Sequence, residues 1–239
     1  MMRPISLLLA AGVLWLAASP AVAQVTVSGE TEIVSDYRYR GVSLSNGKPA
    51  LQGSAELDTG ADFYLGGFAS WVPHGGGPTA VELDASAGYR AAVGAGMTLD
   101  GGVSWYHYPG ADDCDYAEAT AALGWGHGGT SARGGIAWAP RQASLVDAAG
   151  TRRANLYGFA GVEQAIAGTP LSLSLDAGYE SGAFDGAADG GKFDWKGGVA
   201  ASRSGFTLSA SYVGAVRPRA HSGERKREHR LVFALGRSL

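Results

Sequence analysis

Hydrophobic and polar residues alternate one by one along most of this chain, and a period of two is typical of β-strands. Between Val25 and Gly41 the odd positions are apolar, small or aromatic, whereas the even positions carry nearly every charge. The same alternation returns at residues 51–58, 81–90, 99–106, 171–180, 193–202 and 206–212. Each such strand has one face suited to apolar surroundings and one suited to polar surroundings.

Twelve segments of the chain fit this description. The weakest of them begins near Ala154. Its two faces do not differ clearly, because Tyr157 and Phe159 fall on one face while Leu156 and Ala160 fall on the other. Only Glu163 indicates which side is polar. The twelve predicted strands begin near Val25, Pro49, Asp62, Thr79, Met97, Tyr116, Thr130, Ala154, Pro170, Lys192, Phe206 and Arg230.

The connections between these strands also alternate in length. Those after odd-numbered strands are mostly long and polar, at residues 42–48, 73–78, 109–115, 140–153, 181–191 and 216–229. Those after even-numbered strands are short, at residues 59–61, 92–96, 126–129, 167–169 and 203–205. Long loops on one side and tight turns on the other are typical of bacterial outer-membrane barrels, and an even number of strands returns both termini to the same side.

The pattern therefore predicts an all-β fold, a closed antiparallel transmembrane β-barrel of about twelve strands with short periplasmic turns and longer extracellular loops. In lipid, a sheet can span only if it is closed, because no backbone N–H or C=O can be left without a partner. Two belts of aromatic residues are expected on the apolar face: Trp71, Trp105, Trp138, Tyr179, Phe193 and Tyr212 at the long-loop ends, and Phe63, Tyr89, Trp125 and Phe206 at the short-turn ends. The alternative is a soluble secreted sandwich or lipocalin-like barrel, whose apolar faces point inward.

The first 23 residues have the layout of a secretory signal. A basic start at Arg3 precedes an apolar run from Ile5 to Ala18, and Ala21-Val22-Ala23 places small residues before the expected cleavage site. We therefore expect residues 1–23 to be a cleaved signal peptide and residues 24–239 to form the barrel, exported to the bacterial outer membrane.

Composition narrows the possible chemistry. The chain has 38 glycines, a single Cys and only 17% charged residues. One Cys builds no disulfide framework, and no Cys/His spacing suggests zinc, so we expect no cofactor and no metal. The sequence contains neither a Gly-x-Ser-x-Gly elbow nor a His-Glu-x-x-His motif. His74-Gly75-Gly76-Gly77 lies in a loop, and His107 has no evident nucleophile partner, so we expect no enzyme; a lipid-modifying outer-membrane enzyme is the third alternative.

One stretch near the start of the mature chain carries a family resemblance. Residues 35–43 (SDYRYRGVS), followed by 48–53 (KPALQG) and 63–66 (FYLG), resemble the first hairpin of the TorF family of proteobacterial outer-membrane porins. The resemblance implies passive transport across the outer membrane. The closing strand, residues 230–239, ends in Leu239, whereas barrels of this kind usually end in an aromatic residue that the assembly machinery recognises.

By parity, the polar faces place thirteen acids and six bases in the barrel interior. The residues expected to line a pore are Glu32, Asp36, Arg38, Arg40, Glu56, Asp58, Glu82, Asp84, Arg90, Asp176 and Glu180. A hydrated interior of this charge favours passive diffusion of small hydrophilic solutes with a mild preference for cations. The alternative is a non-conducting structural or surface-interaction barrel, in which these charges form a plug of salt bridges.

Arg38 and Arg40 lie two residues apart near the outer end of the first predicted strand. Either they form a constriction with Glu56 or Asp58 across the first hairpin, or they belong to a structural ion-pair ladder between neighbouring strands. The basic loop at residues 217–229 is expected to meet lipopolysaccharide phosphates at the cell surface and not nucleic acid. Other expected partners are outer-membrane lipid and the barrel-assembly machinery, which would bind the C-terminal strand.

Overall fold

The computed structural model describes residues 25–72, 81–111, 114–147, 149–186, 191–217 and 226–239. The predicted signal segment at residues 1–23, the His74–Gly77 motif and most of the basic loop at 217–229 lie outside the described residues. No helix in the described ranges is long and apolar enough to span a membrane.

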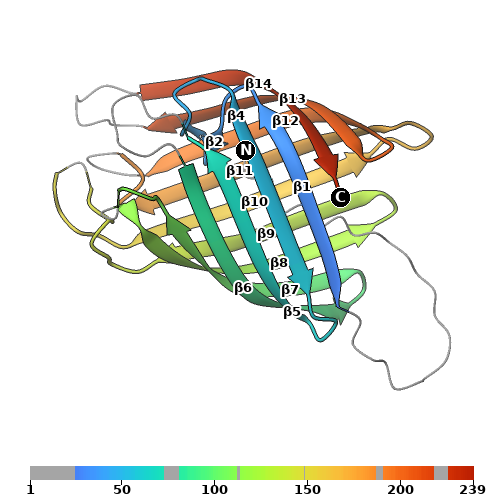
Figure 1. The fold of residues 1–239 in the computed structure, drawn as a ribbon, viewed down its shortest axis with the longest axis horizontal. Coiled ribbons are helices and arrows are strands. Elements are labelled where there is room, and N and C mark those ends of the chain that lie inside the picture. The colour runs from blue at the N-terminus through green and yellow to red at the C-terminus, as the bar shows by residue number, and fades with distance from the viewer. Residues whose placement is uncertain (1–24, 73–80, 112–113, 148, 187–190, 218–225) are drawn as a thin grey trace.

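Twelve antiparallel strands form a closed barrel (Figure 1). In chain order these are β1 (Thr26–Val34), β4 (Ala50–Asp58), β5 (Phe63–Trp71), β6 (Val81–Gly94), β7 (Met97–His107), β8 (Tyr116–His127), β9 (Thr130–Ala139), β10 (Asn155–Ala165), β11 (Leu171–Gly182), β12 (Lys192–Arg203), β13 (Phe206–Arg217) and β14 (Lys226–Ser238). Each strand pairs with its neighbour in the chain, and β1 closes the wall by pairing with β14, from Glu30 opposite Ser238 to Val34 opposite Ala234. The closed barrel and its wiring are as the sequence predicts.

The strand positions agree with the period-two pattern, with two corrections. The last strand begins at Lys226, four residues before the predicted start at Arg230. The first strand was expected to continue to Gly41, but β1 ends at Val34, where it pairs with Ala50 of β4. The alternation from Ser35 onward therefore belongs to a segment that has left the barrel wall.

The outer face of the barrel is apolar. Leu175 is 65% exposed and Val27 is 72% exposed, and the ten aromatic residues predicted for the two belts are all between 41 and 57% exposed. The charged residues Glu56, Asp100 and Glu118 are instead at least 93% buried, on the inner face. This arrangement is the reverse of a water-soluble fold, so the sandwich alternative is wrong.

In strand β10, whose sequence pattern is weak, the odd-numbered residues point inward, as the position of Glu163 predicts. Tyr157 points inward, where its hydroxyl donates a hydrogen bond of 3.1 Å to Asp194 Oδ1 on β12. Phe159, two residues on, lies beneath the guanidinium of Arg133. The two aromatic residues that blurred the pattern are thus interior residues with polar partners.

Candidate functional site in the barrel lumen

The first loop, residues 35–49, folds into the barrel instead of extending away from it. Within it, β2 (Arg38–Tyr39) and β3 (Val42–Ser43) form a short hairpin of their own. Figure 1 shows β2 at the end of the barrel where β1 ends. We call this end the long-loop end and the opposite one the short-turn end. The first loop accordingly occupies the interior at the long-loop end.

Arg40, at the tip of the first loop, bridges two strands of the barrel wall. Its Nη1 donates a hydrogen bond of 2.7 Å to Glu180 Oε1 on β11, and its Nη2 donates one of 2.5 Å to Glu118 Oε1 on β8. The guanidinium also lies 4.2 Å from the ring centroid of Tyr157 on β10. Arginine can make these contacts and lysine cannot, because the planar guanidinium holds several donors in fixed directions and also stacks on an aromatic ring.

Next to Arg40, the loop touches the wall so closely that only glycine fits. Gly41 has a φ of 79°, and a Cβ added there would lie 2.6 Å from the Gly214 carbonyl oxygen and 2.8 Å from Ala215 Cβ, both on β13. The loop that leaves the wall after β1 thus reaches strands on other sides of the barrel, from β8 to β13.

A buried carboxylate braces the loop internally. Asp36, which is fully buried, accepts hydrogen bonds of 2.7 Å from Arg38 Nε and 2.5 Å from Ser43 Oγ. Arg38 also donates through Nη1 to the Gly41 carbonyl oxygen at 2.7 Å. These bonds give the loop a defined shape of its own.

Two apolar clusters pack at the long-loop end. The first joins loop residues Tyr37 and Leu44 to the wall residues Val34, Ala50, Phe68, Val72 and Ala234. The second consists of Tyr106, Tyr108, Tyr116, Ala139, Leu145, Ala183 and Phe184. The loop also contacts the second cluster, where the hydroxyls of Tyr39 and Tyr106 are 3.2 Å apart. Burial raises the pKa of the Tyr39 hydroxyl well above its usual range, so this group stays neutral.

Glu180 is the centre of the charged network at this end. Besides Arg40, it pairs with Lys192 on β12 and accepts a hydrogen bond of 3.0 Å from Asn155 Nδ2 on β10. Neither Lys192 nor Asn155 was among the predicted site residues. Lys192 has the inward parity of Asp194 and Lys196, so the alternation alone could have placed it inside the barrel, although not beside Arg40.

A second charged network lies near the short-turn end. Arg90 on β6 donates hydrogen bonds of 2.9 Å to Glu56 on β4 and 3.0 Å to Asp100 on β7, and Tyr64 donates to the same Asp100 at 3.1 Å. Arg133 on β9 is 4.0 Å from Asp100 and stays 32% exposed. These pairs join neighbouring and near-neighbouring strands across the inner face.

Midway along the barrel, one ion pair remains open to solvent. Lys196 Nζ on β12 lies 3.0 Å from Asp176 Oδ2 on β11, and the Asp176 side chain is 38% exposed. At the long-loop end the described side chains are packed and buried, whereas Asp176 and Arg133 farther along the interior keep part of their side-chain area exposed.

The remaining predicted residues also lie on or near the inner face. Glu32 on β1 is 9% exposed, and Glu82 on β6 accepts a hydrogen bond of 2.9 Å from the Tyr108 hydroxyl. Asp84 follows Glu82 with the same parity, while Asp58, the last residue of β4, accepts a bond of 2.7 Å from the Gly60 N–H in the turn.

The pairing expected for the first-loop arginines is wrong. Arg38 contacts Asp36 of its own loop, Arg40 contacts Glu118 and Glu180, and Glu56 is instead held by Arg90. Period-two counting assumes that Arg38 and Arg40 belong to the wall, and this assumption fails once the chain departs at Ser35. The prediction therefore missed the contact with β8 and β11.

A closed barrel with an apolar exterior, a charged interior and an inserted loop defines a porin-like fold. The structure is similar to that of the NanC porin, with a TM-score of 0.56, 11% sequence identity, and coverage of 88% of this chain and 98% of the porin chain. The outer membrane channel DcaP of Acinetobacter baumannii is less similar, with a TM-score of 0.44 and 12% identity. The match covers 94% of this chain and 100% of the DcaP chain. Identities this low show a shared fold alone.

Sequence comparison assigns the family. A family model described as "Bacterial protein of unknown function (Gcw_chp)" matches residues 17–238, and the chain belongs to this family. No curated protein matches the sequence.

Proposed function

We propose that the protein is an outer-membrane channel through which small hydrophilic solutes diffuse passively. The observation that carries this proposal is the reversal of its two faces, with leucine, valine and aromatic side chains outside and buried charges inside. A closed barrel of this kind satisfies every backbone group while its exterior meets acyl chains. The porin fold, the predicted signal peptide and the resemblance of residues 35–66 to the TorF family support the same function.

The interior offers a hydrated path over part of its length. Asp176 and Arg133 are on inward-facing positions yet keep 38% and 32% of their side-chain area exposed. Acids outnumber bases on the inner face, and rings of carboxylates favour cations. We therefore expect a mild cation preference. Of the residues predicted to line the pore, Asp176 is exposed in the interior, whereas Asp36, Glu82 and Glu180 are buried and would line the path only once the first loop moves.

The first loop sets the narrowest part of this path. Eight-stranded barrels are filled by side chains and barrels of 16–18 strands hold aqueous channels, so about twelve strands leave an interior of intermediate width. Arg40, with Glu118 and Glu180, crosses that interior at the long-loop end. We expect the channel to be small and its conductance low.

A non-conducting structural barrel is the second candidate, and the packing of the long-loop end favours it. Tyr37, Val72 and Leu145 are at most 1% exposed there, as in a protein core. A barrel sealed in this way in all its states would act through its surface and not through its lumen.

The same proposal includes the membrane partners. With the short turns in the periplasm, the long loops would face lipopolysaccharide, and β14 would bind the assembly machinery. Leu239, at the end of that strand, is 88% exposed, and its N–H donates to the Gly29 carbonyl oxygen on β1 at 2.9 Å.

Planar-bilayer recording tests the function. The full-length protein, purified from outer membranes in detergent, should give discrete current steps, with a reversal potential in a KCl gradient that favours K⁺. The matched control is the same membrane preparation from cells without the protein. Absence of steps above that control, with correctly folded barrel in the bilayer, would leave the structural barrel as the better account.

A further inference from the structure

We propose that the first loop is a displaceable plug, that Arg40 is the residue that latches it in the lumen, and that its release opens a wider, cation-selective passage. The proposal rests on the proposed channel function and adds to it the residue that controls both size and charge of the path.

The barrel wall is complete without the first loop. β1 and β4 pair continuously from Thr26 opposite Asp58 to Val34 opposite Ala50, where the loop departs and returns. Among the described residues, the backbone-to-backbone hydrogen bonds of residues 36–49 stay within the loop, from Leu44 to Tyr37 and from Lys48 to Ser45, beside the β2–β3 pair. Residues 36–49 can therefore leave the lumen without breaking a described ladder bond of the wall, while Ser35 stays bonded to the Phe233 carbonyl oxygen on β14.

Side-chain contacts and the close packing of Gly41 thus hold the tip of the loop in place, and Arg40 makes two charge-assisted contacts. Its two hydrogen bonds join it to strands β8 and β11, and charge-assisted bonds of this kind are about twice as strong as neutral ones. By contrast, Arg38 points back to Asp36 and Gly41 within the loop. Arg40 therefore bridges the loop to β8 and β11 on the opposite wall.

The groups that Arg40 contacts determine what its release exposes. Without the guanidinium, Glu118 loses this ion-pair partner, and Glu180 keeps Lys192 and the hydrogen bond from Asn155. Asp194, on the adjacent strand and 7% exposed, borders the place that Gly41 occupies. Three carboxylates and one ammonium group would then face the vacated space. A passage of that composition selects for cations.

The test compares two substitutions that each remove one positive charge from the lumen. Arg40→Gln removes the latch, whereas Arg133→Gln removes an arginine that is part of the wall and 4.0 Å from its nearest carboxylate. In planar bilayers we expect R40Q to raise single-channel conductance severalfold and to shift the reversal potential toward that of K⁺. R133Q removes the same charge from the path without freeing the loop, so it should shift the reversal potential and change conductance far less than R40Q does. Equal conductance in R40Q and R133Q would overturn the latch.

Two further variants test the latch and the plug separately. If R40Q does not assemble, Glu118→Gln tests the same latch from the wall and should give a smaller rise in conductance, with more frequent transitions to a larger open level. A wild-type conductance in E118Q would then overturn the latch. In the other variant, a two-residue Asn-Gly turn replaces residues 36–48, so that the plug is absent. If neither wild type nor this variant conducts, the channel function itself is wrong; if both conduct equally, only the plug is wrong.

Discussion

Arg40 and Glu180 are 140 positions apart in the sequence, yet the Arg40 guanidinium donates a hydrogen bond of 2.7 Å to the Glu180 carboxylate. Their side chains are only 6% and 1% exposed. The contact joins the first loop to β11 across the interior of the barrel. A buried pair like this one adds little net stability, because desolvation offsets the attraction, but losing one partner leaves a costly buried charge. Its main effect is to fix where the loop lies.

The glycine beside Arg40 should be essential for docking the loop. Gly41→Ala introduces a Cβ 2.6 Å from the Gly214 carbonyl oxygen at a φ of 79°. We expect it to lower the free energy of unfolding by about 2–3 kcal/mol, from backbone strain and overpacking together. Urea unfolding of the barrel in lipid vesicles measures this value.

Gly47→Ala is the matched control for that substitution. Gly47 has a φ of 71°, but its nearest neighbour is the flexible end of Arg230, 3.5 Å from the added Cβ. Backbone strain alone should cost about 1 kcal/mol there. Equal losses in G41A and G47A would show that the loop tip does not press against β13.

The network at the short-turn end should contribute to stability more than to conduction. Arg90→Gln leaves Glu56 and Asp100, both about 7% exposed, without the guanidinium that pairs with them. We expect a loss of about 3 kcal/mol in the free energy of unfolding, because a buried charge is left uncompensated. Arg133→Gln, which removes a more exposed arginine, should change stability by less than about 1 kcal/mol. Similar losses from the two substitutions would argue against the burial of the Arg90 network.

The solvent-facing pair in the middle of the barrel should tune ion selectivity in opposite directions. Lys196→Gln leaves the carboxylate of Asp176 unbalanced and should raise the preference for cations, whereas Asp176→Asn should lower it. Each shift should be modest, since salt screens charges in a hydrated lumen. Reversal potentials in a KCl gradient give both signs in one experiment. Two shifts of the same sign would exclude this pair from the conducting path.

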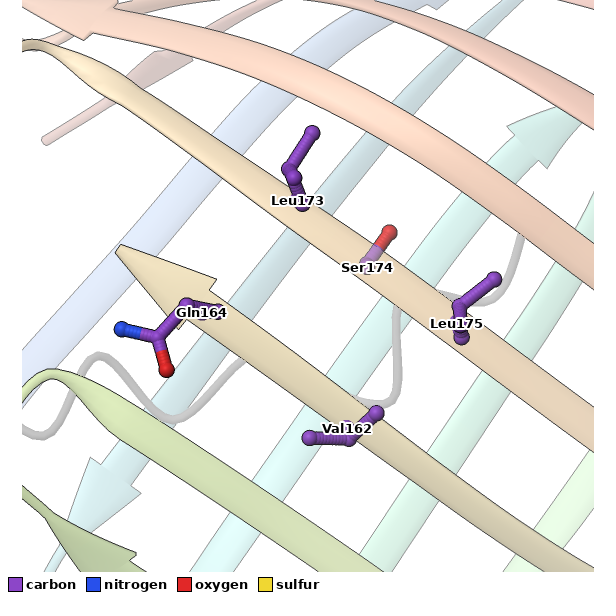
Figure 2. A pocket seen from close by; sticks show the side chains of 5 residues that line it. All are labelled: Val162, Gln164, Leu173, Ser174 and Leu175. Carbon is purple, nitrogen blue, oxygen red and sulfur yellow. The ribbon is translucent and has the colours of Figure 1, made fainter. Parts of the chain in front are cut away.

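A charged side chain on the lipid-facing side of β11 should destabilise the barrel. Leu173 and Leu175 lie beside Val162 and Gln164 of β10 around a shallow hollow of the barrel wall (Figure 2). Leu175 is 65% exposed, so Leu175→Arg should cost about 2 kcal/mol of folding free energy in a bilayer. Ser174→Arg, one residue away and on the inner face, is the control and should cost much less in vesicle unfolding assays. The opposite ranking would reverse the assignment of the two faces.

The alternation of residue types by itself determined the wall of this protein. With the side-chain period of two, each strand has an apolar and a polar side, and the lengths of the connections fix which ends share a side. From this pattern, eleven of the twelve strand starts were placed to within two residues, and Leu175 and Trp71 were placed outside and Glu56 and Glu180 inside. Local sequence suffices for such features, because every strand meets the same two environments.

Only the tertiary structure decided what fills the barrel. Ser35–Gly41 continues the alternation of β1, so nothing local shows that the chain leaves the wall after Val34. The partners of Arg40 lie on β8 and β11, and their proximity depends on the closure of the barrel, which brings strands distant in sequence around one small lumen. Pairing across a lumen has no sequence period. For that reason Arg40 could be identified from the sequence as a candidate for the constriction, but its carboxylate partners Glu118 and Glu180 could not.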